Sequence, residues 1–172
     1  DGYRLARSAG HSVTPLSPAL VSLKSGDAFI PELQGLSLRN VAVKLVRNGK
    51  TVYSDFGEML FTHYGISGPV ILSASSHMDS PETGGYKICV DLKPALDIDS
   101  LDKRIRRDFS EFINKDIINA LSKLIPKKLI PIIVSLSGIP PRTKVNSVTR
   151  EERMRLVHIL KNMEIGISEF YT

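Results

Sequence analysis

The residues best suited to chemistry lie together in one stretch, residues 56–72 (FGEMLFTHYGISGPVIL). Two polar side chains, Thr62 and His63, stand between apolar runs, and an imidazole can act as a general acid or base near neutral pH. Gly65 and Gly68 follow, and glycine permits positive φ angles and a close approach of the backbone to another group. This composition predicts a tight loop that presents polar groups.

The loop leads into a short apolar segment that is typical of a helix. Ser67 is of a type that caps helix N-termini, and Pro69 is favoured in a first helical turn. The free N–H groups of a helix N-terminus bind anions or carbonyl oxygens. Two interpretations follow: the loop offers backbone donors and His63 to a ligand, or it is a strand-to-helix turn without a ligand.

Several motifs of self-contained enzymes are absent from the sequence. It has no G-x-G-x-x-G dinucleotide fingerprint, no phosphate-binding P-loop and no G-x-S-x-G nucleophile elbow. It has no Cys/His cluster with zinc spacing, so no metal site is expected. The one cysteine, Cys89, lies in an apolar alternating run and is expected to be a buried strand residue. The chain is therefore not expected to be a complete redox or hydrolytic enzyme.

The positive charge of the chain is concentrated in one segment. The formal net charge is +5, and residues 97–162 contain 14 Lys/Arg against 8 Asp/Glu. The most basic positions there are Lys103, Arg104, Arg106, Arg107, Lys127 and Lys128. Such a group is either a solvated helix face or a contact surface for a polyanion such as RNA, whose phosphates attract Lys and Arg with little demand on sequence.

A β-rich first part must position the loop. Residues 36–47 alternate between two faces, as a strand does. Asn48-Gly49 follows and is the strongest short hairpin signal, so residues 51–56 are expected to form the returning strand. Residues 86–92 are a further expected strand, closed by a proline.

After residue 96 the hydrophobic pattern changes from strand to helical spacing. Four helices are expected there, the last opened by Ser147 or Thr149, and residues 149–152 (TREE) resemble a capping box. Residues 165–171 are expected to return to the sheet as a last strand. The sequence thus predicts an α+β fold: an N-terminal helix and most of a β-barrel lobe in residues 1–96, an inserted all-helical subdomain in residues 97–162, and a final barrel strand in residues 163–172.

The sequence gives no sign of membrane contact. No apolar run approaches the roughly 20 residues of a transmembrane helix, and the first residues lack the apolar core of a signal peptide. A single cysteine suits a reducing compartment, so cytoplasmic localisation is expected. The start at Asp1, without Met, is expected to reflect a trimmed chain.

Two stretches of the sequence resemble one known family. Residues 57–69 (GEMLFTHYGISGP) are similar to the hallmark segment of the HI0933-like flavoproteins, the NAD(FAD)-utilising dehydrogenases. The opening Asp1-Gly2-Tyr3, with Gly10-His11 and residues 18–21 (PALV), also resembles that family. Because the two matches come in the family's order and the layout of strands and helices agrees, the resemblance covers nearly the whole chain.

The resemblance implies a place within a larger bacterial flavoprotein. In this family a two-segment FAD-binding domain is interrupted by a long insert, which holds a barrel like those of elongation factors and reductases and a small helical domain. This chain resembles the insert alone. FAD is therefore expected in the full-length parent, with NAD(P)H as a candidate reductant and no cofactor held by this chain. The missing FAD-binding domain of the same polypeptide is the expected partner.

The resemblance also gives the loop residues a role. The residues that match the family's hallmark loop are Thr62, His63, Gly65, Ser67 and Gly68. They are expected to line a flavin-facing surface. His63 is either a proton donor to a substrate that receives a hydride or a structural histidine. The chain is then the substrate-side insert of an FAD-dependent oxidoreductase, covering the flavin, shaping the cavity for a small molecule and inactive alone. Two alternatives stay open: an RNA-docking module of a flavoenzyme that reduces a nucleobase in structured RNA, and a purely structural or oligomerisation insert.

Overall fold

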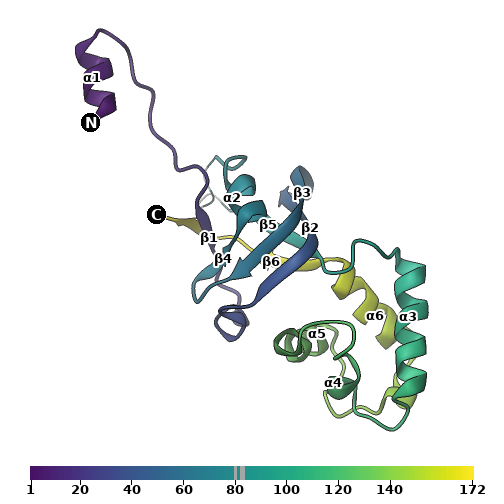
Figure 1. Cartoon of the computed structure of the whole chain (residues 1–172). Coiled ribbons are helices and arrows are strands. Elements are labelled where there is room, and N and C mark those ends of the chain that lie inside the picture. Colours follow the sequence, from purple (N-terminus) through teal and green to yellow (C-terminus); the bar gives the residue numbers. More distant parts are fainter. Residues whose placement is uncertain (80, 82–83) are drawn as a thin grey trace.

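A sheet and a group of helices make up this protein, of which the computed structural model describes residues 1–79, 81 and 84–172 (Figure 1). The strands are β1 (Ser22–Lys24), β2 (Ser37–Arg47), β3 (Lys50–Phe61), β4 (Gly65–Ser67), β5 (Tyr86–Asp91), β6 (Met163–Gly166) and β7 (Glu169–Tyr171). The helices are α1 (Gly2–Ser8), α2 (Pro69–Ser75), α3 (Ile98–Glu111), α4 (Ile117–Ala120), α5 (Ile130–Leu136) and α6 (Arg150–Lys161), with the short 3-10 helices η1 (Pro31–Leu33), η3 (Lys127–Leu129) and η4 (Val145–Ser147). The fold is α+β, as predicted.

One antiparallel sheet joins the strands of the described residues in the order β6-β5-β2-β3-β4-β1-β7. Its centre is the hairpin of β2 and β3, which turns at Asn48 and Gly49 with φ angles of 48° and 80°. Positive φ at both turn residues is the geometry that an Asn-Gly pair favours. The predicted hairpin is therefore confirmed, and β5 and β4 pair on its two outer sides.

The expected β-barrel lobe is present as one antiparallel sheet, which does not close into a barrel. The two edge strands, β6 and β7, are consecutive in the chain and separated only by Ile167 and Ser168, but they do not pair with each other. The last segment instead passes from one edge to the other, because β6 pairs with β5 and β7 pairs with β1. At this crossing the Asp27 carboxylate accepts a hydrogen bond from the Gly166 N–H at 2.8 Å. One chain segment thus connects two edges that remain unpaired with each other.

A bulge interrupts β2 near its start. Its register with β3 shifts between Leu38 and Val41, and Asn40 between them has a φ of 55°. Asparagine tolerates this left-handed conformation better than most residues. Bulges re-aim side chains, and here Arg39 and Asn40 are exposed next to the connection between β5 and α3.

Polar side chains cap the starts of three helices, α1, α3 and α6. Asp97 caps α3 by accepting the Ser100 N–H at 2.7 Å, and Thr149 and Glu152 form the predicted capping box of α6, which satisfies backbone donors that a helix start leaves open. The second predicted helix is shorter than its apolar spacing suggests, since the chain turns after α4 with Leu124 N–H bonded to the Leu121 carbonyl. Among the described residues we find no helix with the length and apolar character of a membrane span.

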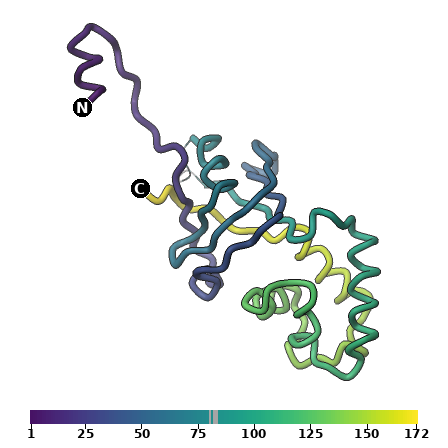
Figure 2. The backbone as a smooth tube through the Cα atoms, viewed as in Figure 1, coloured from purple at the N-terminus to yellow at the C-terminus, as the bar shows by residue number. Residues whose placement is uncertain are grey.

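The N-terminal helix lies away from the rest of the molecule. Figure 2 shows the chain leaving α1 along an extended path to β1. Prolines at positions 15 and 18 favour this path because they exclude helix at the residues before them. No residue of α1 is buried, and the Leu5 and Leu16 side chains are 66% and 64% exposed.

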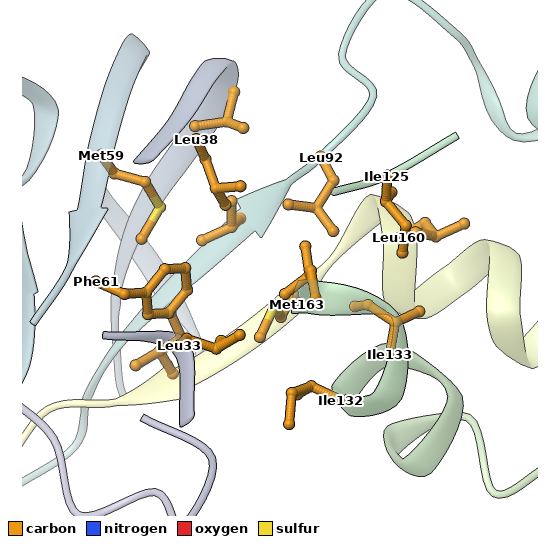
Figure 3. Packing of buried hydrophobic residues seen from close by; sticks show 14 of the residues in the cluster. Leu33, Leu38, Met59, Phe61, Leu92, Ile125, Ile132, Ile133, Leu160 and Met163 are labelled. Carbon is orange, nitrogen blue, oxygen red and sulfur yellow. The ribbon is translucent and has the colours of Figure 1, made fainter. Parts of the chain in front are cut away.

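A hydrophobic cluster fills the space between the sheet and the helices of residues 98–161. Figure 3 shows Leu33 and Phe61 on the side of η1 and β3, Ile132 and Ile133 on the side of α5, and Met163 between them. Complete burial of such a side chain stabilises a fold by about 1.5–3 kcal/mol. The sheet and the helices are therefore coupled through shared packing, while the division at residues 96 and 162 stays a prediction.

Candidate functional site

The turn between β3 and β4 carries Thr62 and His63. Thr62 closes this turn from both sides: its N–H donates to the Gly65 carbonyl at 2.9 Å, and its hydroxyl accepts the Gly65 N–H at 3.1 Å. The Tyr64 carbonyl accepts the Ser25 N–H at 3.0 Å. These bonds fix the backbone of the turn and leave His63 exposed at its tip.

Close packing against β1 explains why position 65 is a glycine. A Cβ atom at this position would lie 2.0 Å from the Leu23 carbonyl oxygen and 2.9 Å from Lys24 Cα. Both are backbone atoms in a paired strand, so neither can move aside. Gly65 therefore has a structural role that needs no ligand.

Gly68, and not Ser67, is the N-cap residue of α2. Gly68 has a φ of 98°, and a Cβ there would lie 2.9 Å from Met59 Cα. The expected Ser67 cap is wrong because Ser67 still belongs to β4, opposite Leu60 of β3. Its hydroxyl accepts a hydrogen bond from the Ser22 hydroxyl at 2.7 Å, which ties β4 to β1.

Three rings, His63, Tyr64 and Tyr171, form what we call the aromatic corner. The Tyr64 and Tyr171 rings stack with centroids 3.6 Å apart and planes 3° from parallel. The His63 ring meets Tyr64 edge-on, with centroids 4.9 Å apart. Such ring pairs stabilise beyond the area they bury. The Lys24 ammonium lies 5.9 Å from the Tyr171 ring centre and pairs with Glu169 at 2.8 Å.

Sequence reasoning missed Tyr171. The residue lies at the far end of the chain and reaches Tyr64 because β7 pairs with β1, in a register that places Ser22 opposite Tyr171. A returning last strand is expected from the sequence. Its register and partner, however, depend on tertiary packing that alternation alone does not specify.

The predicted basic residues of α3 divide into paired and unpaired side chains. Arg104 Nε donates to both carboxylate oxygens of Asp108 at 3.0 Å, and Arg107 Nε lies 3.9 Å from the same group. Asp108 is only 4% exposed, so this ion pair belongs to the packing of α3. Lys103 and Arg106 are exposed and have no ion pair within the described residues.

Lys127 and Lys128 do not share a cavity with the α3 cations. The Lys128 ammonium donates to the Gln34 carbonyl oxygen and joins η3 to the segment after η1. Lys127 lines a cavity with Lys115 and Asn119 among others, whereas the α3 cations line a different one. The polyanion contacts expected from the sequence stay a prediction, with Lys127 and the α3 cations on different cavities.

Cys89 lies in β5 and is 6% exposed. Burial, and then the negative charge of Glu164, raises the pKa of its thiol. A raised pKa keeps the group protonated and unreactive near neutral pH, in agreement with the expected structural role. Within the described residues, no three His, Cys, Asp or Glu side chains are grouped to hold a metal ion.

Comparisons with known proteins agree with this architecture in part. A family model described as "HI0933-like protein barrel and H2TH domain" matches residues 17–171. The chain is 34% identical over 145 residues to the 3-dehydro-bile acid delta(4,6)-reductase of Clostridium scindens, which covers 81% of this chain and 34% of that protein.

Two further relatives carry a different name. The chain is 28% identical over 139 residues to the ribosomal RNA dihydrouridine synthase of Escherichia coli, covering 81% of this chain and 32% of that protein. It is 28% identical over 165 residues to the protein of the same name from Haemophilus influenzae, covering 95% and 38%. The chain thus spans about a third of the length of these relatives. On the family match and these identities, the chain belongs to the HI0933-like family.

Proposed function

We propose that this chain is the substrate-side insert of an FAD-dependent oxidoreductase, in which it covers the flavin and shapes the substrate cavity. Family membership supports the proposal, since the relatives' names describe the reduction of a bile acid and of uridine in ribosomal RNA. The observation that carries it is the aromatic corner, where the fold holds the exposed His63 beside two stacked tyrosines.

The aromatic corner suits contact with a flat ring. The Tyr171 side chain is 42% exposed, and the turn beside it is already fixed by Thr62 and Gly65, so docking requires little further ordering. FAD, bound by the rest of the polypeptide, supplies the hydride when it has been reduced, with NAD(P)H as the candidate donor. The turn orients the substrate and excludes water, and an imidazole nitrogen of His63 donates the proton.

The N-terminal segment supports a partner domain within the same polypeptide. The family match begins at residue 17, and the preceding residues extend away from the body of the protein (Figure 2). Tyr3 and Leu5 of α1 are 52% and 66% exposed. Large apolar side chains exposed on such a short helix are typical of a segment that packs against another domain, and the FAD-binding domain is the proposed occupant.

A second candidate function is RNA docking. The observation that favours it is the net positive charge of residues 97–162, together with relatives named as ribosomal RNA dihydrouridine synthases. In that case the parent reduces a nucleobase of structured RNA, and the helices hold the RNA by its phosphates. A purely structural or oligomerisation insert is the outcome if neither flavin nor RNA is contacted.

The role of His63 is tested in the full-length parent with His63→Ala and, as a matched control, the exposed His158→Ala on α6. We expect His63→Ala to slow reoxidation of the reduced flavin by substrate by about 10²-fold or more, while reduction of the flavin by NAD(P)H is unchanged. His158→Ala should behave as the wild type. Equal reoxidation rates in both variants would remove His63 from the reaction.

A further inference from the structure

A groove runs along the junction between the sheet and the helices, and we call it the junction groove. Its central cavity, of about 610 Å³, is lined by Arg39, Asn40, Phe56 and residues 92–96. A second cavity shares Leu96 with it and continues along α3, and a third shares Arg39. Because these cavities share lining residues, they form a continuous surface along the connection from β5 to α3.

Positive charge lines the junction groove from both sides. Arg39 comes from the β2 bulge, Lys93 from the connection after β5, and Lys103 and Arg104 from α3. Of these four cations, only Arg104 has a carboxylate partner within the described residues, namely Asp108. The groove therefore has an excess of positive charge contributed by three separate elements.

Lys93 is the cation in this groove whose positive charge the folded chain disfavours. Its side chain is half-buried, and the Asp91 carboxylate nearby is engaged by Lys161 at 2.6 Å. Burial, and then the charge of Arg104, lowers the pKa of the Lys93 ammonium. An anion bound in the groove would relieve this repulsion, because an opposite charge favours the charged form of a base.

An aromatic side chain stands at the same place. Phe56 on β3 is 58% exposed although it is a large apolar residue, and it shares the central cavity with the Asn40 amide. Exposed aromatic rings next to cations are typical of single-stranded nucleic-acid sites, where a base stacks on the ring and the backbone phosphates meet Lys or Arg.

We propose that the junction groove binds a single-stranded segment of RNA, with its phosphates on Arg39, Lys93 and Lys103 and a base stacked on Phe56. The proposal rests on the RNA-docking role and locates it at the sheet–helix junction, so that Lys127 and Lys128 take no part. Charge complementarity and the exposed ring favour RNA over an acidic peptide, which offers carboxylates but no base to stack.

The test measures binding of a 5′-labelled single-stranded RNA 12-mer to the 172-residue chain by fluorescence anisotropy over a range of salt. The variants are Lys93→Gln, Arg39→Gln and Phe56→Leu. Lys50→Gln is the matched control, since Lys50 is exposed at the far end of the β2–β3 hairpin. Circular dichroism of each variant checks that the fold is retained.

We expect Lys93→Gln and Arg39→Gln each to weaken binding several-fold and to reduce the slope of log affinity against log salt by about 0.7. Phe56→Leu should weaken binding about fivefold or more without changing that slope. Lys50→Gln should match the wild type.

The other outcomes are also decisive. If RNA binds but the groove variants match Lys50→Gln, the groove is wrong while RNA docking stands, and Lys127→Gln and Lys128→Gln then locate the true surface. If the wild type binds no RNA, the groove and the RNA-docking role both fail. If a poly-glutamate peptide binds as tightly as RNA and Phe56→Leu has no effect, the groove takes an acidic protein segment instead.

Discussion

At position 65 the fold leaves no space for a side chain, because a Cβ atom would lie 2.0 Å from the Leu23 carbonyl oxygen. We predict that Gly65→Ala destabilises the chain by about 3 kcal/mol or more, since the clash is with backbone atoms and is relieved only by parting β1 from β4. Urea unfolding followed by circular dichroism measures this. Gly26→Ala is the control, since nothing lies within 4 Å of its Cβ position; equal stability of the two variants would contradict the packing explanation.

Lys93 is expected to make stability depend on pH. In the unfolded chain its ammonium regains the ordinary pKa of 10.5, whereas burial and Arg104 lower that pKa in the folded chain. As the pH rises toward 10.5, the folded chain loses this proton before the unfolded chain does. The unfolded chain then binds more protons, so the free energy of unfolding increases with pH.

Lys93→Gln removes this dependence. We predict that the variant is more stable than the wild type at pH 7 and that its advantage shrinks as the pH approaches 10.5. Urea unfolding at pH 7, 9 and 10 measures the difference in the free energy of unfolding between variant and wild type. For the control Lys50→Gln this difference should stay constant. If the stability difference between Lys93→Gln and the wild type did not change with pH, the folded chain would not disfavour the charge of the Lys93 ammonium.

At the scale of elements, Lys161 at the end of α6 ties the helices to the sheet. Its ammonium contacts the Asp91 carboxylate at 2.6 Å, the Lys93 carbonyl at 3.0 Å and the Leu96 carbonyl. The Lys161 side chain is only 17% exposed, so solvent screens this contact less than a surface pair.

We predict that Lys161→Met costs about 2 kcal/mol, because the Asp91 charge and two carbonyls lose a half-buried partner. Lys144→Met, which breaks a more exposed pair with Asp116, should cost less than about 1 kcal/mol. Chemical unfolding compares the two. If the denaturant concentration at the unfolding midpoint were no lower for Lys161→Met than for Lys144→Met, packing alone would hold α6 to the sheet.

Local signals in the sequence predict the elements better than their arrangement. Asn48-Gly49 specifies the hairpin and Thr149 with Glu152 starts α6, because turn and cap chemistry act over a few residues. The predicted barrel lobe does not close, since β6 pairs with β5 and β7 with β1, and the passage between these two edges involves contacts such as Asp27 with Gly166. Such long-range contacts leave no periodic signal in either segment.

The candidate site shows the same limit. His63 and Thr62 are found from composition, since polar residues between glycines and apolar runs are unusual. Tyr171 and the junction groove are not, because Tyr171, Arg39, Phe56 and Lys93 come from distant segments that only the sheet and its helices bring together.

At the scale of the whole molecule, the surfaces proposed for function lie on different parts of the fold. The aromatic corner is at the edge of the sheet formed by β4, β1 and β7. The junction groove is between the sheet and α3. With the flavin and the reacting group at the aromatic corner, and the flanking strand in the junction groove, each part of the insert would have a separate task.

Hydrogen exchange of the full-length parent, with and without FAD, tests the central claim that this insert covers the flavin. We predict that FAD slows exchange in residues 62–68 and leaves α5, on the helical side, unchanged. If exchange in residues 62–68 were the same with and without FAD, while the FAD-binding domain itself became protected, the loop would not face the flavin and the insert would have another role.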